Sequence, residues 1–221
     1  ADMGNKSIKL VIFDLDGTLI DSTEEIKFIV NSVLENNNFQ KRSKNFYIKN
    51  IGNGIKDLLL KSLPQNTDTD LERLLVQVKQ LYSDNLNKKS RVFEGIYNDL
   101  DHLVEHDIHI GIVTNKLHTL ALRCVEKFFK DYNIVLYGAG YLFPRKPNSN
   151  STLEIIKHYD LKPANTLFIG DSVIDINTAK NANIISGGVL WGNGIDQELR
   201  SANADLIFEH PNDLYTYLSD K

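Results

Sequence analysis

The chain has 221 residues, of which 42% are hydrophobic and 24% are charged; this indicates a soluble globular protein with one sizeable core, or one core and a smaller added domain. A net charge of −4 gives no basic footprint for nucleic acid, and the single cysteine, Cys124, excludes an internal disulfide. No apolar run is long enough to span a membrane and the amino terminus lacks a signal-peptide pattern, so we expect a cytoplasmic protein.

The first predicted element is a buried parallel strand at residues 9–13, because the residues that follow Lys9 form an unbroken apolar run. It is followed by Asp14 and Asp16, and Gly17 allows the chain to turn sharply. Two carboxylates at the end of a strand could seat a cation and a nucleophile. An Asp-Gly pair is also a common turn, so these residues alone leave both interpretations open.

The next part of the chain, from Asp21 to Lys89, predicts helices and no strand. Apolar residues recur at helical spacing in three stretches, at residues 22–36, 53–63 and 69–81. Two pairs have the spacing of a capping box, Ser22 with Glu25 and Thr69 with Glu72. We therefore expect a helical domain at residues 21–89, separate from a core domain made of residues 1–20 and 90–221.

The remaining chain alternates between predicted strands and helices. The strands are expected at residues 108–114, 134–137, 166–169, 184–190 and 205–208, and the helices at 96–104, 120–129, 153–159 and from 212. Such alternation predicts an α/β fold with a doubly wound, mostly parallel sheet that helices cover on both faces.

Polar residues follow three of the predicted strands: Asp14 and Asp16, Thr114 and Asn115, and Asp171 with Asp175. One such residue is usually a turn former or a helix cap. Ligands of open α/β sheets bind at the carboxyl ends of the strands, so three ends of this kind together indicate a functional site. Three Gly-x-Gly pairs lack the third glycine of a dinucleotide fingerprint, so a nicotinamide dinucleotide site is not supported. No Gly-Lys-Ser/Thr occurs either, so the sequence contains no phosphate-binding loop of the nucleoside-triphosphatase type.

Four motifs, in this order, resemble those of the haloacid dehalogenase-like phosphatases, and within them the phosphoglycolate phosphatase group. They are Asp14-Leu15-Asp16-Gly17-Thr18-Leu19, Thr114-Asn115, Lys146-Pro147, and Gly170-Asp171-Ser172 with Asp175. The resemblance covers nearly the whole chain. It implies a Rossmann-like core and a smaller α-helical cap, in which the Gly52-Asn53-Gly54 turn would face the active site and help to choose substrates.

The resemblance also implies an activity, that of a magnesium-dependent phosphatase acting on a small phosphorylated metabolite such as 2-phosphoglycolate. Asp14 would attack phosphorus to give an aspartyl-phosphate, and Asp16 would protonate the leaving oxygen and later deprotonate water. The expected Mg²⁺ ligands are the Asp14 carboxylate, the Asp16 backbone carbonyl and Asp171. Asp175 would hold Lys146 or a metal-bound water.

The phosphoryl oxygens would be bound by Thr114, Asn115 and Lys146, with Lys116 as a rival of Lys146. Within the same family, inorganic pyrophosphatase and sugar-phosphate mutase activity stay open. A phospho-aspartate receiver domain has its acceptor on a later strand and lacks a cap, and an inactive binding module is disfavoured because every motif acid is present. The sequence leaves monomer and dimer open.

Overall fold

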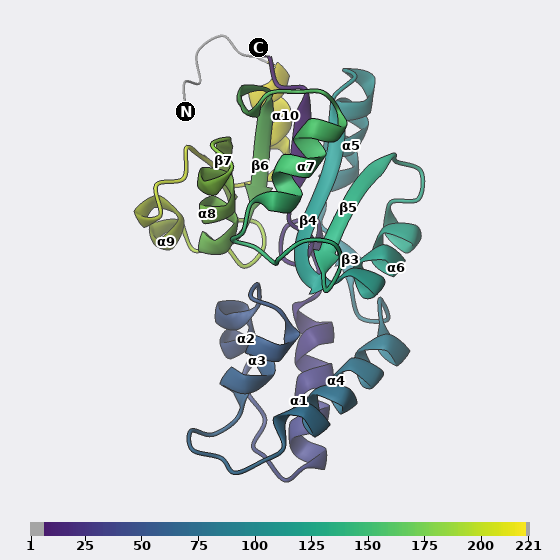
Figure 1. Cartoon of the computed structure of the whole chain (residues 1–221), viewed down its shortest axis with the longest axis vertical. Coiled ribbons are helices and arrows are strands. Elements are labelled where there is room, and N and C mark those ends of the chain that lie inside the picture. The colour runs from purple at the N-terminus through teal and green to yellow at the C-terminus, as the bar shows by residue number, and fades with distance from the viewer. Residues whose placement is uncertain (1–6, 220–221) are drawn as a thin grey trace.

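The computed structural model describes residues 7–219. A six-stranded parallel sheet lies between helices in the upper part of the molecule as drawn in Figure 1. The strands are β1 (Leu10–Phe13), β4 (His109–Leu117), β5 (Ile134–Ala139), β6 (Thr166–Gly170), β7 (Ile185–Val189) and β8 (Leu206–Phe208). Their order in space is β5-β4-β1-β6-β7-β8, and every neighbouring pair is parallel. The chain thus leaves β1 toward β4 and β5 and returns to the other side of β1 at β6. This confirms the predicted α/β, doubly wound sheet.

Helices cover both faces of this sheet, as predicted. They are α5 (Ile96–Glu105), α6 (His118–Phe128), α7 (Asn150–His158), α8 (Val173–Asn181), α9 (Asp196–Ser201) and α10 (Pro211–Ser219), with a 3₁₀ turn at Pro163–Asn165. Hydrophobic residues form one cluster on each face of the sheet, and strand β1 contributes to both. Leu10 and Ile12 pack with residues of α7 and α8, whereas Val11 and Phe13 pack with residues of α5, α6 and α10. Because side chains alternate along a strand, one fully apolar strand is buried on both faces.

Four further helices lie apart from the sheet, at the bottom of Figure 1. They are α1 (Thr23–Asn36), α2 (Lys44–Asn50), α3 (Ile55–Ser62) and α4 (Leu71–Asn85), here called the helical unit. Two short antiparallel strands, β2 (Ile20–Asp21) and β3 (Arg91–Val92), connect this unit to the rest of the chain. None of the helices within residues 7–219 is both long and apolar enough to cross a membrane.

The structure differs from the predicted elements in a few places. The predicted absence of strand from Asp21 onward is wrong by one residue, because Asp21 pairs with Arg91 in the β2–β3 ribbon. Helices α2 and α9 were not predicted; both are short, so they contain too few turns for an apolar periodicity to appear.

Neither predicted capping box forms. Ser22 is the N-cap of α1, but its hydroxyl donates to Asp16 instead of capping the helix. The N-cap of α4 is Asp70, one residue after the predicted cap Thr69, and its carboxylate accepts a hydrogen bond from the Arg73 backbone N–H. The charge-assisted hydrogen bond turns the Ser22 side chain toward the Asp16 carboxylate, and in this orientation its oxygen accepts no hydrogen bond from a backbone N–H of α1.

Candidate functional site

The carboxyl ends of β1, β4 and β6 are neighbours in the sheet, because these three strands are adjacent. Asp14 follows β1, Thr114 to Lys116 form the end of β4, and Asp171 follows β6. Gly17 turns the first loop over this edge with φ +84°, a conformation that L side chains rarely adopt. A Cβ atom at this position would lie 2.3 Å from Asp171 Oδ2, so glycine is needed for the close approach of the two loops.

Three buried carboxylates meet at this edge. Oxygen atoms of Asp14, Asp171 and Asp175 all lie within 4.8 Å of one another. Burial and the charge of Asp175 raise the pKa of Asp14 to about 6, and burial together with the charges of Asp14 and Asp175 raises the pKa of Asp171 well above its usual value. A bound cation would relieve this repulsion.

Lys146 neutralises part of this charge. Its Nζ atom lies 2.8 Å from Asp14 Oδ1 and 2.6 Å from Asp175 Oδ1, and its side chain is only 2% exposed. Burial disfavours the ammonium, but the two carboxylates outweigh this cost and raise the pKa of Lys146 above its usual value. Three carboxylates and one ammonium leave a buried site with an excess of negative charge and hard oxygen donors. This donor set fits a divalent cation such as Mg²⁺.

Asn115 connects three parts of the site. Its Oδ1 accepts from the Lys146 backbone N–H at 2.8 Å, and its Nδ2 donates to the Lys146 carbonyl at 3.2 Å and to the Gly52 carbonyl at 3.0 Å. The side chain thus fixes the Lys146 loop and attaches the helical unit to β4. Both amide N–H groups have protein acceptors here, so the predicted contact of Asn115 with a phosphoryl oxygen stays a prediction.

The Asp16 carboxylate does not belong to the three-acid cluster. It accepts hydrogen bonds from Lys116 Nζ at 3.1 and 3.3 Å and from Ser22 Oγ at 2.6 Å. Lys116 also donates to the hydroxyl of Tyr82, which comes from α4 of the helical unit. Lys116 thus lies at Asp16 while Lys146 lies at Asp14, and the two rival lysines occupy different places.

Tyr82 is a site residue that the sequence pattern did not single out, because the predicted helix ended at residue 81. Its one signal is spacing: Leu74, Val78 and Tyr82 recur on the buried face of α4. A tyrosine on the buried face of a helix is normally interpreted as a core residue, and a role in a site is inferred only when its hydrogen-bond partner is known. That partner, Lys116, is 34 positions away in the sequence.

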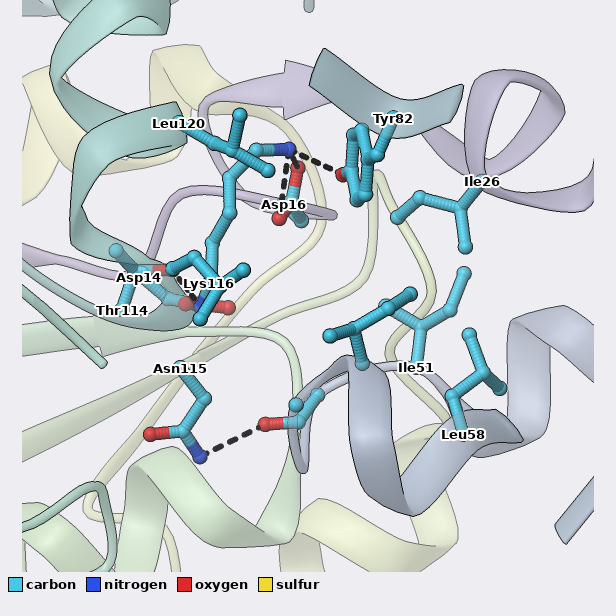
Figure 2. Close-up of a pocket in the computed structure, with 14 residues that line it drawn as sticks. Asp14, Asp16, Ile26, Ile51, Leu58, Tyr82, Thr114, Asn115, Lys116 and Leu120 are labelled. Atoms are coloured by element: carbon cyan, nitrogen blue, oxygen red, sulfur yellow. Dashed lines mark hydrogen bonds and ion pairs between the residues drawn. The ribbon is translucent and has the colours of Figure 1, made fainter. Parts of the chain in front are cut away.

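A cavity of about 40 Å³ lies between the site and the helical unit. Figure 2 shows the Lys116 ammonium between Asp16 and Tyr82 on one side, with apolar side chains of the helical unit opposite. Its polar lining comes from Asp14, Asp16, Tyr82, Thr114, Asn115 and Lys116, and its apolar walls from Ile26, Ile51, Ile55, Leu58, Leu117 and Leu120. This volume is room for roughly three water molecules, so the cavity suits a small group.

The Gly52-Asn53-Gly54 turn lies at this cavity. Gly52 and Gly54 line it, and Asn53 lines a neighbouring cleft together with Asp171 and two lysines of the helical unit, Lys49 and Lys61. The turn is held by the Asn115–Gly52 hydrogen bond and by a second one from Arg145 to the Asn53 carbonyl.

The chain is similar to several known proteins. A model of the haloacid dehalogenase-like hydrolase family matches residues 11–189. A protein from Nitrosococcus oceani named phosphoglycolate phosphatase is 26% identical, over 92% of this chain and 93% of its own. One of the same name from Haemophilus influenzae is 27% identical, over 97% of this chain and 100% of its own. The crystal structure of a "predicted phosphoglycolate phosphatase" from Haemophilus somnus superimposes with a TM-score of 0.88 at 26% identity, over 97% of this chain and 99% of that one.

Proposed function

Because the chain belongs to the family of haloacid dehalogenase-like hydrolases, as its four motifs predict, we propose that it is a Mg²⁺-dependent phosphatase of small phosphomonoesters, with 2-phosphoglycolate as the first candidate substrate. The observation that carries the proposal is the buried cluster of Asp14, Asp171 and Asp175 with Lys146, at the end of the sheet where ligands of this fold bind. The names of the relatives, which match along nearly the whole chain, support the substrate.

The proposed reaction has two steps. A carboxylate oxygen of Asp14 attacks phosphorus, the bond from phosphorus to the ester oxygen breaks, and the leaving oxygen takes a proton from Asp16. Water then attacks phosphorus of the aspartyl-phosphate, gives a proton to Asp16, and releases phosphate and free Asp14. Support for this role of Asp16 comes from the cavity, which Asp16 and Asp14 both line.

Mg²⁺ would be held by Asp14 and Asp171, with the Asp16 backbone carbonyl, and would supply positive charge to the phosphoryl group. Lys146 lowers the negative charge at Asp14, so an anionic ester can approach the nucleophile. Asp175 holds the Lys146 ammonium in place. The Thr114 hydroxyl lines the cavity and would donate to a phosphoryl oxygen.

The helical unit would act as a cap over this site, and we propose that residues 21–89 form it and that residues 1–20 and 90–221 form the core domain. Support comes from the cavity, whose apolar walls are contributed largely by the helical unit, and from the Gly52–Gly54 turn at its edge. The single, buried Cys124 thiol also supports the proposal that the enzyme acts in the reducing cytoplasm.

The test is phosphate release by the purified protein from 2-phosphoglycolate, p-nitrophenyl phosphate, pyrophosphate and sugar phosphates, with Mg²⁺ or with a chelator. We expect Mg²⁺-dependent release from 2-phosphoglycolate. Asp14→Asn should lower kcat by at least about 10³-fold, because an amide does not attack phosphorus. Full activity of a folded Asp14→Asn variant, or release that does not depend on a divalent cation, would contradict the proposal.

A further inference from the structure

Acidic side chains outnumber basic ones around the cavity. Among its lining residues, all within the described part of the chain, Asp14 and Asp16 are acidic and Lys116 is the one cation. The wall opposite Lys116 is apolar, with Ile26, Ile51 and Leu58 (Figure 2). An anionic group that entered this space would be costly to bury unless it contacted a cation, and Lys116 is the cation within reach.

Tyr82 keeps a hydrogen-bond donor for a ligand, and Lys116 places a buried positive charge beside it. The Lys116 ammonium donates to both carboxylate oxygens of Asp16, at 3.1 and 3.3 Å, and to the Tyr82 hydroxyl, so a ligand at this ammonium would take the place of the longer of the two Asp16 contacts. Tyr82 accepts from Lys116, and among residues 7–219 no hydrogen bond is recorded in which the Tyr82 O–H donates. The Lys116 side chain is 1% exposed and Tyr82 is 3% exposed, so neither donor has bulk water as its alternative partner.

The position of Lys116 also determines how far a bound group lies from the ester oxygen of the substrate. Its ammonium lies 3.1 Å from Asp16 Oδ1, and Asp16 is the proposed donor to the ester oxygen. A group bound to Lys116 would therefore lie only a few bonds from the ester oxygen.

We propose that Lys116, with the Tyr82 hydroxyl beside it, binds a carboxylate on the alcohol portion of the substrate and so selects short phosphorylated hydroxy acids. This inference rests on the proposed phosphatase function and names the residues that determine its specificity. Lys116 comes from β4 and Tyr82 from α4, so the carboxylate site is complete only when the helical unit lies against the sheet domain.

The neighbouring cleft offers a different place for an anion. Lys49 and Lys61 line it together with Asp171, but both lysines are exposed. An exposed ammonium is hydrated and screened, and therefore discriminates weakly between a charged and a neutral group. Lys49→Met is thus a matched control for Lys116→Met, with the same chemical change near the same site.

The experiment compares 2-phosphoglycolate with its amide, which has nearly the same shape but no carboxylate charge. The quantity measured is the ratio of kcat/KM for the acid to kcat/KM for the amide. We expect Lys116→Met to lower this ratio by about 10- to 100-fold and Tyr82→Phe by about 3- to 10-fold, from the loss of one charged and one neutral hydrogen bond. Lys49→Met should keep the ratio of the unmodified protein.

Lys116→Met also removes a partner of Asp16, so rates should fall with both substrates. The ratio cancels that common loss. A second measurement does not depend on turnover: binding of 3-phosphonopropionate and of propylphosphonate, followed by calorimetry in Mg²⁺. The unmodified protein and Lys49→Met should bind the carboxylated phosphonate more tightly, and Lys116→Met should lose this preference.

The outcomes separate this inference from the proposed function. If the protein hydrolyses p-nitrophenyl phosphate and the ratio or the binding preference survives in Lys116→Met, or disappears in Lys49→Met instead, the assignment of Lys116 is wrong while the phosphatase function stands. If the protein hydrolyses no phosphomonoester, the proposed function fails, and the two phosphonates still decide whether Lys116 binds a carboxylate.

Discussion

At the scale of single residues, two buried lysines divide the charges of the site. Lys146 contacts Asp14 and Asp175, whereas Lys116 contacts Asp16. Asp171 forms no ion pair with a lysine among the described residues. It accepts a hydrogen bond from the Thr18 hydroxyl at 3.3 Å and lies close to the like charges of Asp14 and Asp175. Asp171 is therefore the carboxylate with most to gain from a bound cation.

This leads to a prediction for Asp171→Asn. Magnesium that binds only the folded protein should stabilise the parent by about 2.7 kcal/mol at a hundredfold excess over Kd, and so raise its Tm by several degrees. The variant loses a proposed ligand and part of the repulsion, so its Tm should respond less to Mg²⁺ while its Tm without metal is equal to or above that of the parent. Thermal unfolding in MgCl₂, with KCl at matched ionic strength as the control, measures both. Equal shifts with the two salts, or a full Mg²⁺ response in the variant, would exclude the cluster as a metal site.

At the scale of elements, helix α5 carries a buried acid that takes no part in the site. Asp99 is 2% exposed, and neither of its carboxylate oxygens has a hydrogen-bond partner among the described residues. Helix α10 packs against this helix and contributes Asp213 and Tyr215; His102 lies on α5 itself and His106 directly follows the helix. Burial, and then the charge of Asp213, raises the pKa of Asp99 from 3.8 to about 8.

Stability should therefore fall as the pH rises toward this value. Between pH 3.8 and about 8 the folded protein keeps a proton on Asp99 that the unfolded chain has lost, so each rise in pH favours unfolding; the contribution is complete below pH 3.8 and is lost as the pH passes about 8. Asp99→Asn cannot ionise. Its Tm should match that of the parent near about pH 3.5 and exceed it by a growing margin up to about pH 8.5, by about 2–4 °C for each kcal/mol regained.

The control is Glu105→Gln, the same type of change at an exposed position of the same helix. Its difference from the parent should be small at both values of pH. A parent whose Tm is flat across this range, or a Glu105→Gln variant that behaves like Asp99→Asn, would show that Asp99 does not carry the effect.

At the scale of the whole molecule, the sequence predicts what local patterns determine. Alternation of apolar runs predicts the parallel sheet, and the polar residues at the carboxyl ends of β1, β4 and β6 predict the edge that carries the site. Contacts between distant elements cannot be predicted in this way, because hydrophobic periodicity identifies the buried face of an element but not the element that packs against it. The Lys116–Tyr82 contact, the use of Ser22 at Asp16 and the Asn115–Gly52 link all depend on how the helical unit lies against the sheet.

These links predict that the position of the helical unit controls substrate binding. Arg145 is exposed and donates to the Asn53 carbonyl, so it attaches the Gly52–Gly54 turn to the sheet domain without contacting the three-acid cluster. Arg145→Ala should raise KM for the substrate by about 2- to 10-fold, since one hydrogen bond that holds the helical unit in its present position is lost, and should change kcat less. Amide hydrogen exchange should become faster at residues 51–55, whereas the Tm shift with Mg²⁺ should stay that of the parent because the proposed ligands are intact.

Arg200→Ala is the matched control. Arg200 is an exposed residue of helix α9, and within residues 7–219 its ion pair is with Asp196 of the same helix. It should leave KM and the exchange of residues 51–55 unchanged. Faster exchange in Arg145→Ala with an unchanged KM would show that the turn is attached by Arg145 but does not control binding. A changed Mg²⁺ response would show instead that the substitution disturbs the carboxylate cluster, and the rise in KM would then carry no information about the helical unit.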